Sequence, residues 1–179
     1  MNSNWQNLTW LFFHKLSLNQ NIKKNKHYEI FMNTFKILLP CSICRNHFML
    51  MLDNDENNFY ENINKMNLFN LTVHLHNSVN KRIYKRIWSN KEAEKYYKSN
   101  YLTYYIIKQF FNIYIYYNLK KGPLKTENLI KMIKSFSHIF PRPHIRDKLI
   151  NFQNKMKVDR DNFHKWIVVY LLIIRNEMK

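Results

Sequence analysis

Residues 40–44 read Pro-Cys-Ser-Ile-Cys and contain both cysteines of a chain of 179 residues. Pro40 disfavours helical backbone at the residue before it, so it ends the helix that apolar spacing predicts over residues 27–39. The same proline can begin the next helix, predicted over residues 41–52, because its missing N–H is not needed in a first turn. This stretch therefore predicts two consecutive helices joined by a tight turn that carries both thiols.

The spacing of the two cysteines allows three interpretations. At i and i+3 on a first helical turn, Cys41 and Cys44 share one face, with Cβ atoms about 5–6 Å apart, so they can form a disulfide with little movement. A helix N-terminus also lowers the pKa of a thiol, which a redox-active cysteine requires. The alternatives are two unrelated buried thiols and half of a zinc site. The zinc site would need His74 and His76, which face different ways on a helix because they are two residues apart. We favour a redox dithiol.

Composition narrows the fold class further. The single glycine excludes glycine-rich nucleotide loops and leaves little material for tight β-hairpins, and 46% apolar residues exclude general disorder. Apolar residues at helical spacing predict an all-α protein: a four-helix bundle with a short fifth helix over residues 1–97, followed by a second helical domain over residues 98–179. The predicted helices cover residues 4–19, 27–39, 41–52, 68–87, 89–97, 99–119, 126–139, 145–157 and 161–177. Residues 53–58 are expected to form a polar break, and Ser-Asn-Lys-Glu at 89–92 to cap the fifth helix.

The chain is strongly basic, with 29 Lys and Arg against 12 Asp and Glu, a net charge of +17. Residues 98–179 hold 16 basic and five acidic side chains, a net charge of +11. A surplus of this size is typical of proteins that bind nucleic acid or acidic surfaces. The high content of Asn, Lys, Ile and Tyr offers a second explanation, a compositional bias of an AT-rich genome. We expect no membrane span, because the most apolar stretches are interrupted or shorter than the roughly 20 residues that a bilayer requires.

Polar residues interrupt the apolar face of the helix predicted over residues 68–87. On a helical wheel Asn80 lies about 40° from His76, so both belong to the inward side, and Asn77 lies on its border. Lys81 and His74 fall on the opposite face. Inward polar side chains must be hydrogen-bonded, so these residues are either satisfied core polars or part of a binding site.

Three motifs in order are similar to the signature of the Erv/ALR family of FAD-linked sulfhydryl oxidases. They are Trp10-Leu-Phe-Phe-His14, the Cys-Ser-Ile-Cys of residues 41–44, and His-Asn-Ser-Val-Asn at residues 76–80. The resemblance covers residues 5–97 and is strongest to members from large DNA viruses. The chain departs from the family in having no second cysteine pair, and in carrying Ile83-Tyr84-Lys85 where the family has Leu-Gly-Lys.

The resemblance implies a thiol oxidase that passes electrons from dithiols through a Cys41–Cys44 disulfide to FAD and then to O2, giving H2O2. Cys41 is expected to meet the substrate and Cys44 to lie nearer the flavin. The expected FAD-binding residues are Trp10, His14, His76, Asn77, Val79, Asn80, Arg82, Ile83 and Lys85. No metal is expected.

The expected partners are protein dithiols or a thiol-relay protein, molecular oxygen and a second copy of the chain in a homodimer. Since no signal peptide is visible, the predicted location is cytoplasmic, or for a viral protein the host cytoplasm, virus factory and virion, with virion proteins as substrates. The alternative function is a basic helical module, with a degenerate oxidase fold, that binds nucleic acid or a partner through residues 98–179. Binding of nucleic acid by that module would weaken steeply with salt.

Overall fold

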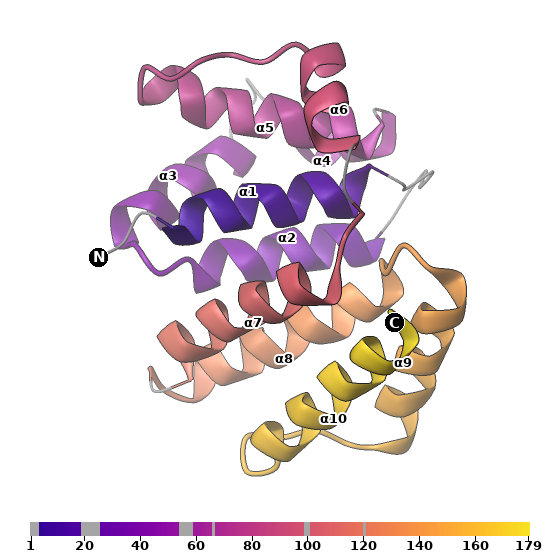
Figure 1. Cartoon of the computed structure of the whole chain (residues 1–179). Helices are drawn as coiled ribbons and strands as arrows, with labels where there is room; N and C mark the ends of the chain where they lie inside the picture. Colours follow the sequence, from indigo (N-terminus) through magenta and orange to yellow (C-terminus); the bar gives the residue numbers. More distant parts are fainter. Residues whose placement is uncertain (1–3, 19–25, 54–58, 66, 99–100, 120) are drawn as a thin grey trace. The chain divides into compact units, whose positions relative to one another are not determined.

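The computed structural model describes residues 4–18, 26–53, 59–65, 67–98, 101–119 and 121–179. Within these ranges there are ten helices and no strand, which confirms the all-α class (Figure 1). The helices are α1 (Asn4–Ser17), α2 (Lys26–Leu38), α3 (Ser42–Asp53), α4 (Phe59–Lys65), α5 (Leu68–Arg82), α6 (Asn90–Lys98), α7 (Tyr104–Asn118), α8 (Pro123–His138), α9 (Pro143–Lys155) and α10 (Phe163–Glu177). None of the described helices is both long enough and apolar enough to cross a membrane.

The predicted helix over residues 68–87 is wrong at its end, because α5 stops at Arg82. Tyr84 has a φ of 54°, in the left-handed region. The N–H of Lys85 donates to the carbonyl of Asn80 at 2.8 Å, and that of Tyr84 donates to Lys81 at 3.4 Å. These two bonds and the left-handed residue form a Schellman motif, which ends a helix by satisfying its last carbonyls.

The short helix α4 was not predicted from the sequence. Its seven residues are too few to show a clear apolar repeat, since this pattern is read over windows of 11 residues or more. Residues 54–58 of the predicted polar break lie outside the described residues.

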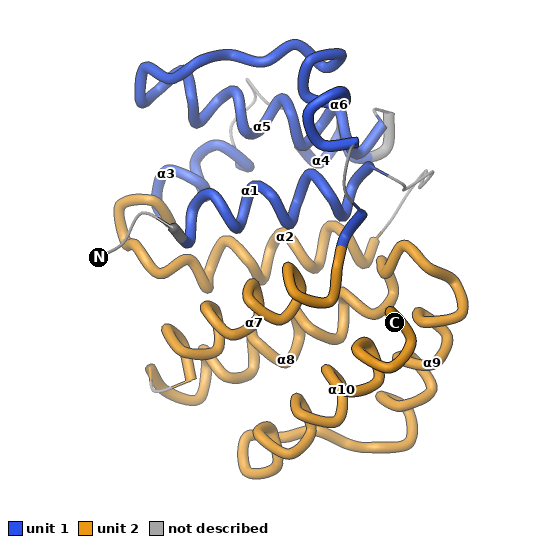
Figure 2. The backbone as a smooth tube through the Cα atoms, in the orientation of Figure 1, with its two compact units in different colours: residues 1–25, 46–102 blue, residues 26–45, 103–179 orange. Residues whose placement is uncertain are grey.

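The chain forms two compact units (Figure 2). One consists of Met1–Asn25 and Asn46–Leu102, and the other of Lys26–Arg45 and Thr103–Lys179. The predicted boundary near residue 98 is close to the last crossing between the units. That prediction did not include the segment 26–45, which carries α2 and both cysteines.

In the first unit, α1 packs against α5 and α6. Its buried cluster joins Phe69 and Val73 of α5 with Ala93 and Tyr97 of α6. The predicted cap of α6 is confirmed as a capping box: the N–H of Glu92 donates to Ser89 Oγ at 3.2 Å, and the N–H of Ser89 donates to Glu92 Oε2 at 2.9 Å. The box fixes the start of α6 and so the place of Tyr97 in the core.

In the second unit, α2 packs along α8, and both belong to an aromatic core with α7. Phe31 and Phe35 of α2 are fully buried. Phe31 contacts Phe136 of α8 with ring centroids 6.2 Å apart, and Phe35 contacts Tyr114 of α7 at 5.3 Å. The buried face of α2 is therefore covered by helices that lie more than 60 residues later in the chain.

Candidate active site

The two cysteines form a disulfide, with Cα atoms 5.2 Å apart. Cys41 immediately precedes α3, and its carbonyl accepts from the N–H of Arg45 at 2.9 Å, the first hydrogen bond of that helix. The N–H of Cys44 donates to Cys41 Sγ at 3.1 Å. Cys41 is thus the N-cap residue of α3, with sulfur in place of the usual side-chain oxygen. Such a position stabilises a thiolate after reduction, because a main-chain N–H and the helix dipole both face the sulfur.

The turn between the cysteines is open to solvent. Ser42 is exposed and Ile43 is 66% exposed, whereas Cys41 and Cys44 are each partly buried. An external thiol can therefore approach this turn over the small Ser42 and the apolar Ile43.

Trp10, His14 and His76, three of the residues expected at an FAD site, come together in the first unit. The rings of Trp10 and His76 are stacked, with centroids 4.2 Å apart and an interplanar angle of 5°. His14 Nε2 and His76 Nδ1 are 2.9 Å apart and share one proton as a hydrogen bond. On its other side His14 stacks on Tyr97, with centroids 4.0 Å apart. Helices α1, α5 and α6 thus all contribute to one cluster.

Both histidines of this cluster are neutral at pH 7. Burial, with a smaller contribution from neighbouring charges, lowers the pKa of His14 to about 3 and that of His76 to about 4. His14 Nδ1 is buried and has no hydrogen-bond partner among the described residues. A buried polar atom without a partner is costly, so this nitrogen offers a hydrogen bond to a polar ligand. The half-buried Trp10 adds an aromatic ring beside it. These features fit a large aromatic cofactor such as FAD.

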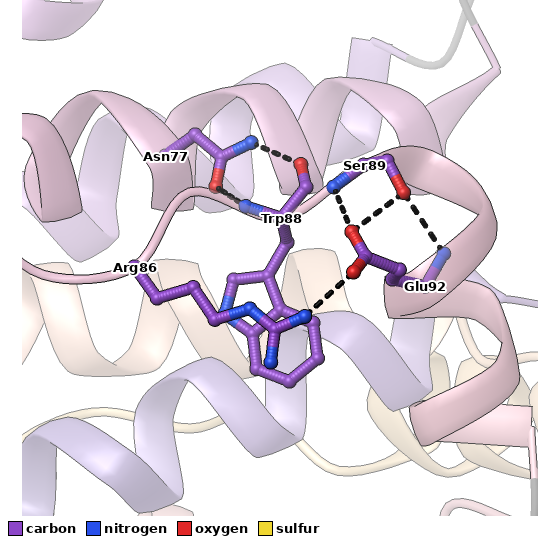
Figure 3. A network of polar contacts seen from close by, with 5 residues as sticks. All are labelled: Asn77, Arg86, Trp88, Ser89 and Glu92. Carbon is purple, nitrogen blue, oxygen red and sulfur yellow. Dashed lines mark hydrogen bonds and ion pairs between the residues drawn. The ribbon is translucent and has the colours of Figure 1, made fainter.

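Asn77 and Asn80 fix the segment that follows α5, and Figure 3 shows the contacts of Asn77. The side chain of Asn77 makes two hydrogen bonds to the main chain of Trp88, donating to its carbonyl at 2.7 Å and accepting from its N–H at 2.9 Å. Asn80, which is buried, donates from Nδ2 to the carbonyl of Arg86 at 2.8 Å. Together they tie residues 83–88 to the helix from which they come.

The exposed side of this segment carries a charged contact. The guanidinium of Arg86 lies 4.8 Å from the ring centroid of Trp88 and pairs with Glu92 at 2.6 Å (Figure 3). The hydrogen bonds of Ser89 and the ion pair with Arg86 lower the pKa of Glu92 to about 2. Glu92 therefore stays ionised and joins the segment to the first turn of α6.

The remaining residues expected at an FAD site lie at the end of α5. Val79 is half-buried, and Arg82, Ile83 and Lys85 are exposed on the last turn and the Schellman motif. His74 and Lys81 are exposed, as the helical wheel predicted. The structure thus brings Trp10, His14 and His76 into direct contact and leaves the last three residues on the surface.

Two residues of this cluster were missed by the sequence analysis. Lys15 is buried, and its ammonium group donates to the carbonyl of Tyr97 near the end of α6. Burial lowers the pKa of Lys15 and raises that of Tyr97 to about 12. The sequence did contain a signal for the burial of Lys15. This residue follows His14 in a helix whose neighbouring apolar residues, Phe12, Phe13 and Leu16, are all buried.

Comparison with known proteins gives one finding. A family model described as the Erv1/Alr family matches residues 7–98, about half of the chain. No curated protein and no solved structure matches the chain.

Proposed function

The chain belongs to the Erv1/Alr family of FAD-linked sulfhydryl oxidases, and from this premise we propose that it oxidises protein dithiols through the Cys41–Cys44 disulfide. The observation that carries the proposal is this disulfide itself, which begins a helix in a turn open to solvent. The net reaction converts two thiols and O2 into one disulfide and H2O2. Two electrons and two protons pass from the substrate to oxygen.

Cys41 is the sulfur that we propose for attack by substrate. A substrate thiolate would bond to Cys41 Sγ and release Cys44 as a thiolate, forming a mixed disulfide. The second substrate thiol would then displace Cys41, leaving an oxidised substrate and a reduced pair. The N–H of Cys44 and the N-terminus of α3 favour this step, because they stabilise the thiolate that Cys41 becomes.

The cofactor would be held by the cluster around His14. Trp10, His14 and His76 would contact the cofactor, and His14 Nδ1 would form a hydrogen bond with it. The hydrogen bonds of Asn77 and Asn80 to the main chain would keep the neighbouring segment in place. Val79, Arg82, Ile83 and Lys85 would extend the contact. When bound, FAD accepts two electrons from the reduced cysteines and returns them to oxygen. The neutral histidines would hold it without adding positive charge.

The finer biological role is also a proposal. We propose that the protein is viral, as the resemblance of its motifs to members from large DNA viruses led us to expect, and that it forms disulfides in virion proteins in the cytoplasm. Since the chain has no further cysteines, the substrate or a thiol-relay protein must meet Cys41 directly, with a homodimer as the expected assembly.

The test is oxygen consumption by the purified protein with a dithiol. We expect a yellow protein that consumes oxygen, and a Cys44→Ser variant that keeps its flavin but loses turnover. Ser42→Ala, a change between the two cysteines, is the matched control and should remain active. A colourless protein that cannot be reconstituted with FAD would contradict the proposal.

A further inference from the structure

The carbonyl groups that lead into the redox turn are held by side chains from the C-terminal half of the chain. Because α2 ends at Leu38 and Pro40 follows, the last carbonyls of this helix have no helical partner. Asn118 Nδ2, at the end of α7, donates to the carbonyl of Leu38 at 2.8 Å. Lys125 Nζ, in the first turns of α8, donates to the carbonyl of Ile37.

Arg45, the residue after Cys44, completes this set. Its Nη1 lies 3.2 Å from the carbonyl of Leu39 and 3.4 Å from that of Ile37. Three consecutive carbonyls, of residues 37–39, therefore all accept from side chains. Two of the four donor contacts come from residues about 80 positions later in the sequence.

Asn118 and Lys125 are built into this arrangement. Asn118 is 1% exposed and also donates to the carbonyl of Tyr114 at 2.9 Å, so both its amide hydrogens are used. Lys125 is half-buried, and burial lowers its pKa together with the nearby charges of Arg45 and Lys121. Three cationic side chains thus lie close together at the C-terminal end of α2.

This arrangement has an electrostatic consequence for the cysteines. The free carbonyls at a helix C-terminus carry partial negative charge, and Cys41 follows the end of α2 by three residues. Such charge disfavours a thiolate nearby. Hydrogen bonds from cationic and amide donors neutralise it, while the N-terminus of α3 favours the thiolate from the other side of the turn.

We propose that Asn118 and Lys125 are positioning residues for the Cys41–Cys44 pair, through which the C-terminal helices hold the redox turn and favour its reduced form. The proposal rests on the proposed function only in taking this pair as redox-active. It gives the helices of residues 103–179 a part in the reaction.

The first test changes Lys125 in the full chain. In a glutathione buffer, two glutathione thiols reduce Cys41–Cys44 and form one glutathione disulfide. We expect Lys125→Met to lower the equilibrium constant of this reduction about threefold, and to slow alkylation of the reduced protein by iodoacetamide at pH 7 about threefold. Lys125→Arg should restore both values. Lys131→Met, an exposed lysine on the same helix, should change neither.

The second test uses Asn118→Ser, whose side chain is too short to reach Leu38. Asn128→Ser is its matched control, because Asn128 also donates to a carbonyl four residues earlier, at 2.8 Å, but only within α8. We expect Asn118→Ser to lower the equilibrium constant and slow the alkylation as Lys125→Met does. Asn128→Ser should change neither value. Unchanged equilibrium and alkylation in both Lys125→Met and Asn118→Ser, whatever their melting temperatures, would overturn the proposal. Neither measurement needs FAD, so a protein without flavin would contradict the proposed function and leave this result standing.

Discussion

At the scale of single residues, the cluster around His14 combines two neutral imidazoles with a buried nitrogen that lacks a partner. The hydrogen bond between His14 and His76 needs one nitrogen as donor and the other as acceptor. Protonating either ring would place a charge in a buried site and, on the acceptor, remove the lone pair. The cluster is therefore suited to bind a neutral or anionic ligand group at ordinary pH and should fail in acid.

The histidines predict a loss of stability as the pH falls from about 6.5 to about 4 for His76 and to about 3 for His14. Their pKa values in the folded protein, about 3 and about 4, lie below the value of 6.5 in an unfolded chain. The unfolded state therefore binds more protons in this range, and the free energy of unfolding falls as the pH falls, by up to about 2 kcal/mol per histidine from pH 6.5 to pH 5.

Urea unfolding at pH 6.5 and at pH 5 measures this decrease in the free energy of unfolding. His14→Phe, which keeps an aromatic ring against Tyr97, should lose less free energy between them than the parent protein does. The exposed His74→Gln variant should behave as the parent. Equal losses in parent and His14→Phe would show that this histidine does not titrate on unfolding.

Asn77 predicts a second effect at the residue scale. Asn77→Leu keeps the size of the side chain and removes both hydrogen bonds to the main chain of Trp88, which should lower the free energy of unfolding by about 1–3 kcal/mol. If the segment after α5 contacts FAD, the variant should also bind FAD more weakly in a titration. Ser78→Ala, which changes the half-buried neighbouring residue on the same helix, is the control. Unaltered stability in Asn77→Leu would show that these bonds contribute nothing net.

At the scale of elements, the turn that ends α5 contains one of the residues in which the chain departs from the family pattern. The residue that replaces the glycine of Leu-Gly-Lys is Tyr84, and it has the left-handed φ of the Schellman motif. Glycine adopts this conformation without the penalty of about 1–2 kcal/mol that a side chain causes. Tyr84 is held in this conformation by Asn80, whose carbonyl accepts from the N–H of Lys85 and whose side chain donates to the carbonyl of Arg86.

Substitutions at Tyr84 should reveal this strain. The side chain is 98% exposed, so its removal costs little packing. We expect Tyr84→Gly to raise the free energy of unfolding by up to about 1 kcal/mol, and Tyr84→Ile, with a β-branched side chain, to lower it. Chemical denaturation of the two variants and the parent protein ranks their free energies of unfolding. Equal stability of the glycine and isoleucine variants would refute the argument.

The elements also show what the sequence could and could not reveal. Pro40 ends α2, and Ser89 with Glu92 forms a local capping box, so both features were predicted correctly from neighbouring residues. The prediction that Pro40 lies in the first turn of α3 was wrong, because it precedes the N-cap residue Cys41. The end of α5 was not predicted correctly, because a tyrosine in a left-handed turn carries no sequence signal. The burial of Lys15 depends on the carbonyl of Tyr97, 82 residues away, which no local pattern contains.

At the scale of the whole molecule, the same limit applies to the partner of α2. Its apolar spacing predicts a buried face but does not say which helix covers it. The sequence analysis placed this helix in a domain of residues 1–97, whereas its core contacts within the second unit are with α7 and α8. The segment with the cysteines therefore lies in the N-terminal half of the sequence but packs with helices of the C-terminal half.

This packing predicts that residues 1–102 do not suffice to fold the redox segment. Deleting residues 103–179 would expose Phe31 and Phe35, which are fully buried. Each exposed side chain would lower the free energy of unfolding by about 1.5–3 kcal/mol. The deletion would also remove both Asn118 and Lys125. Because small domains are stable by only about 5–15 kcal/mol, we expect the truncated chain to aggregate or to lose cooperative unfolding in urea, and co-expression of residues 103–179 to rescue it. A truncated monomer that unfolds in one sharp transition would instead show that the N-terminal half folds alone, as the single boundary near residue 98 predicts.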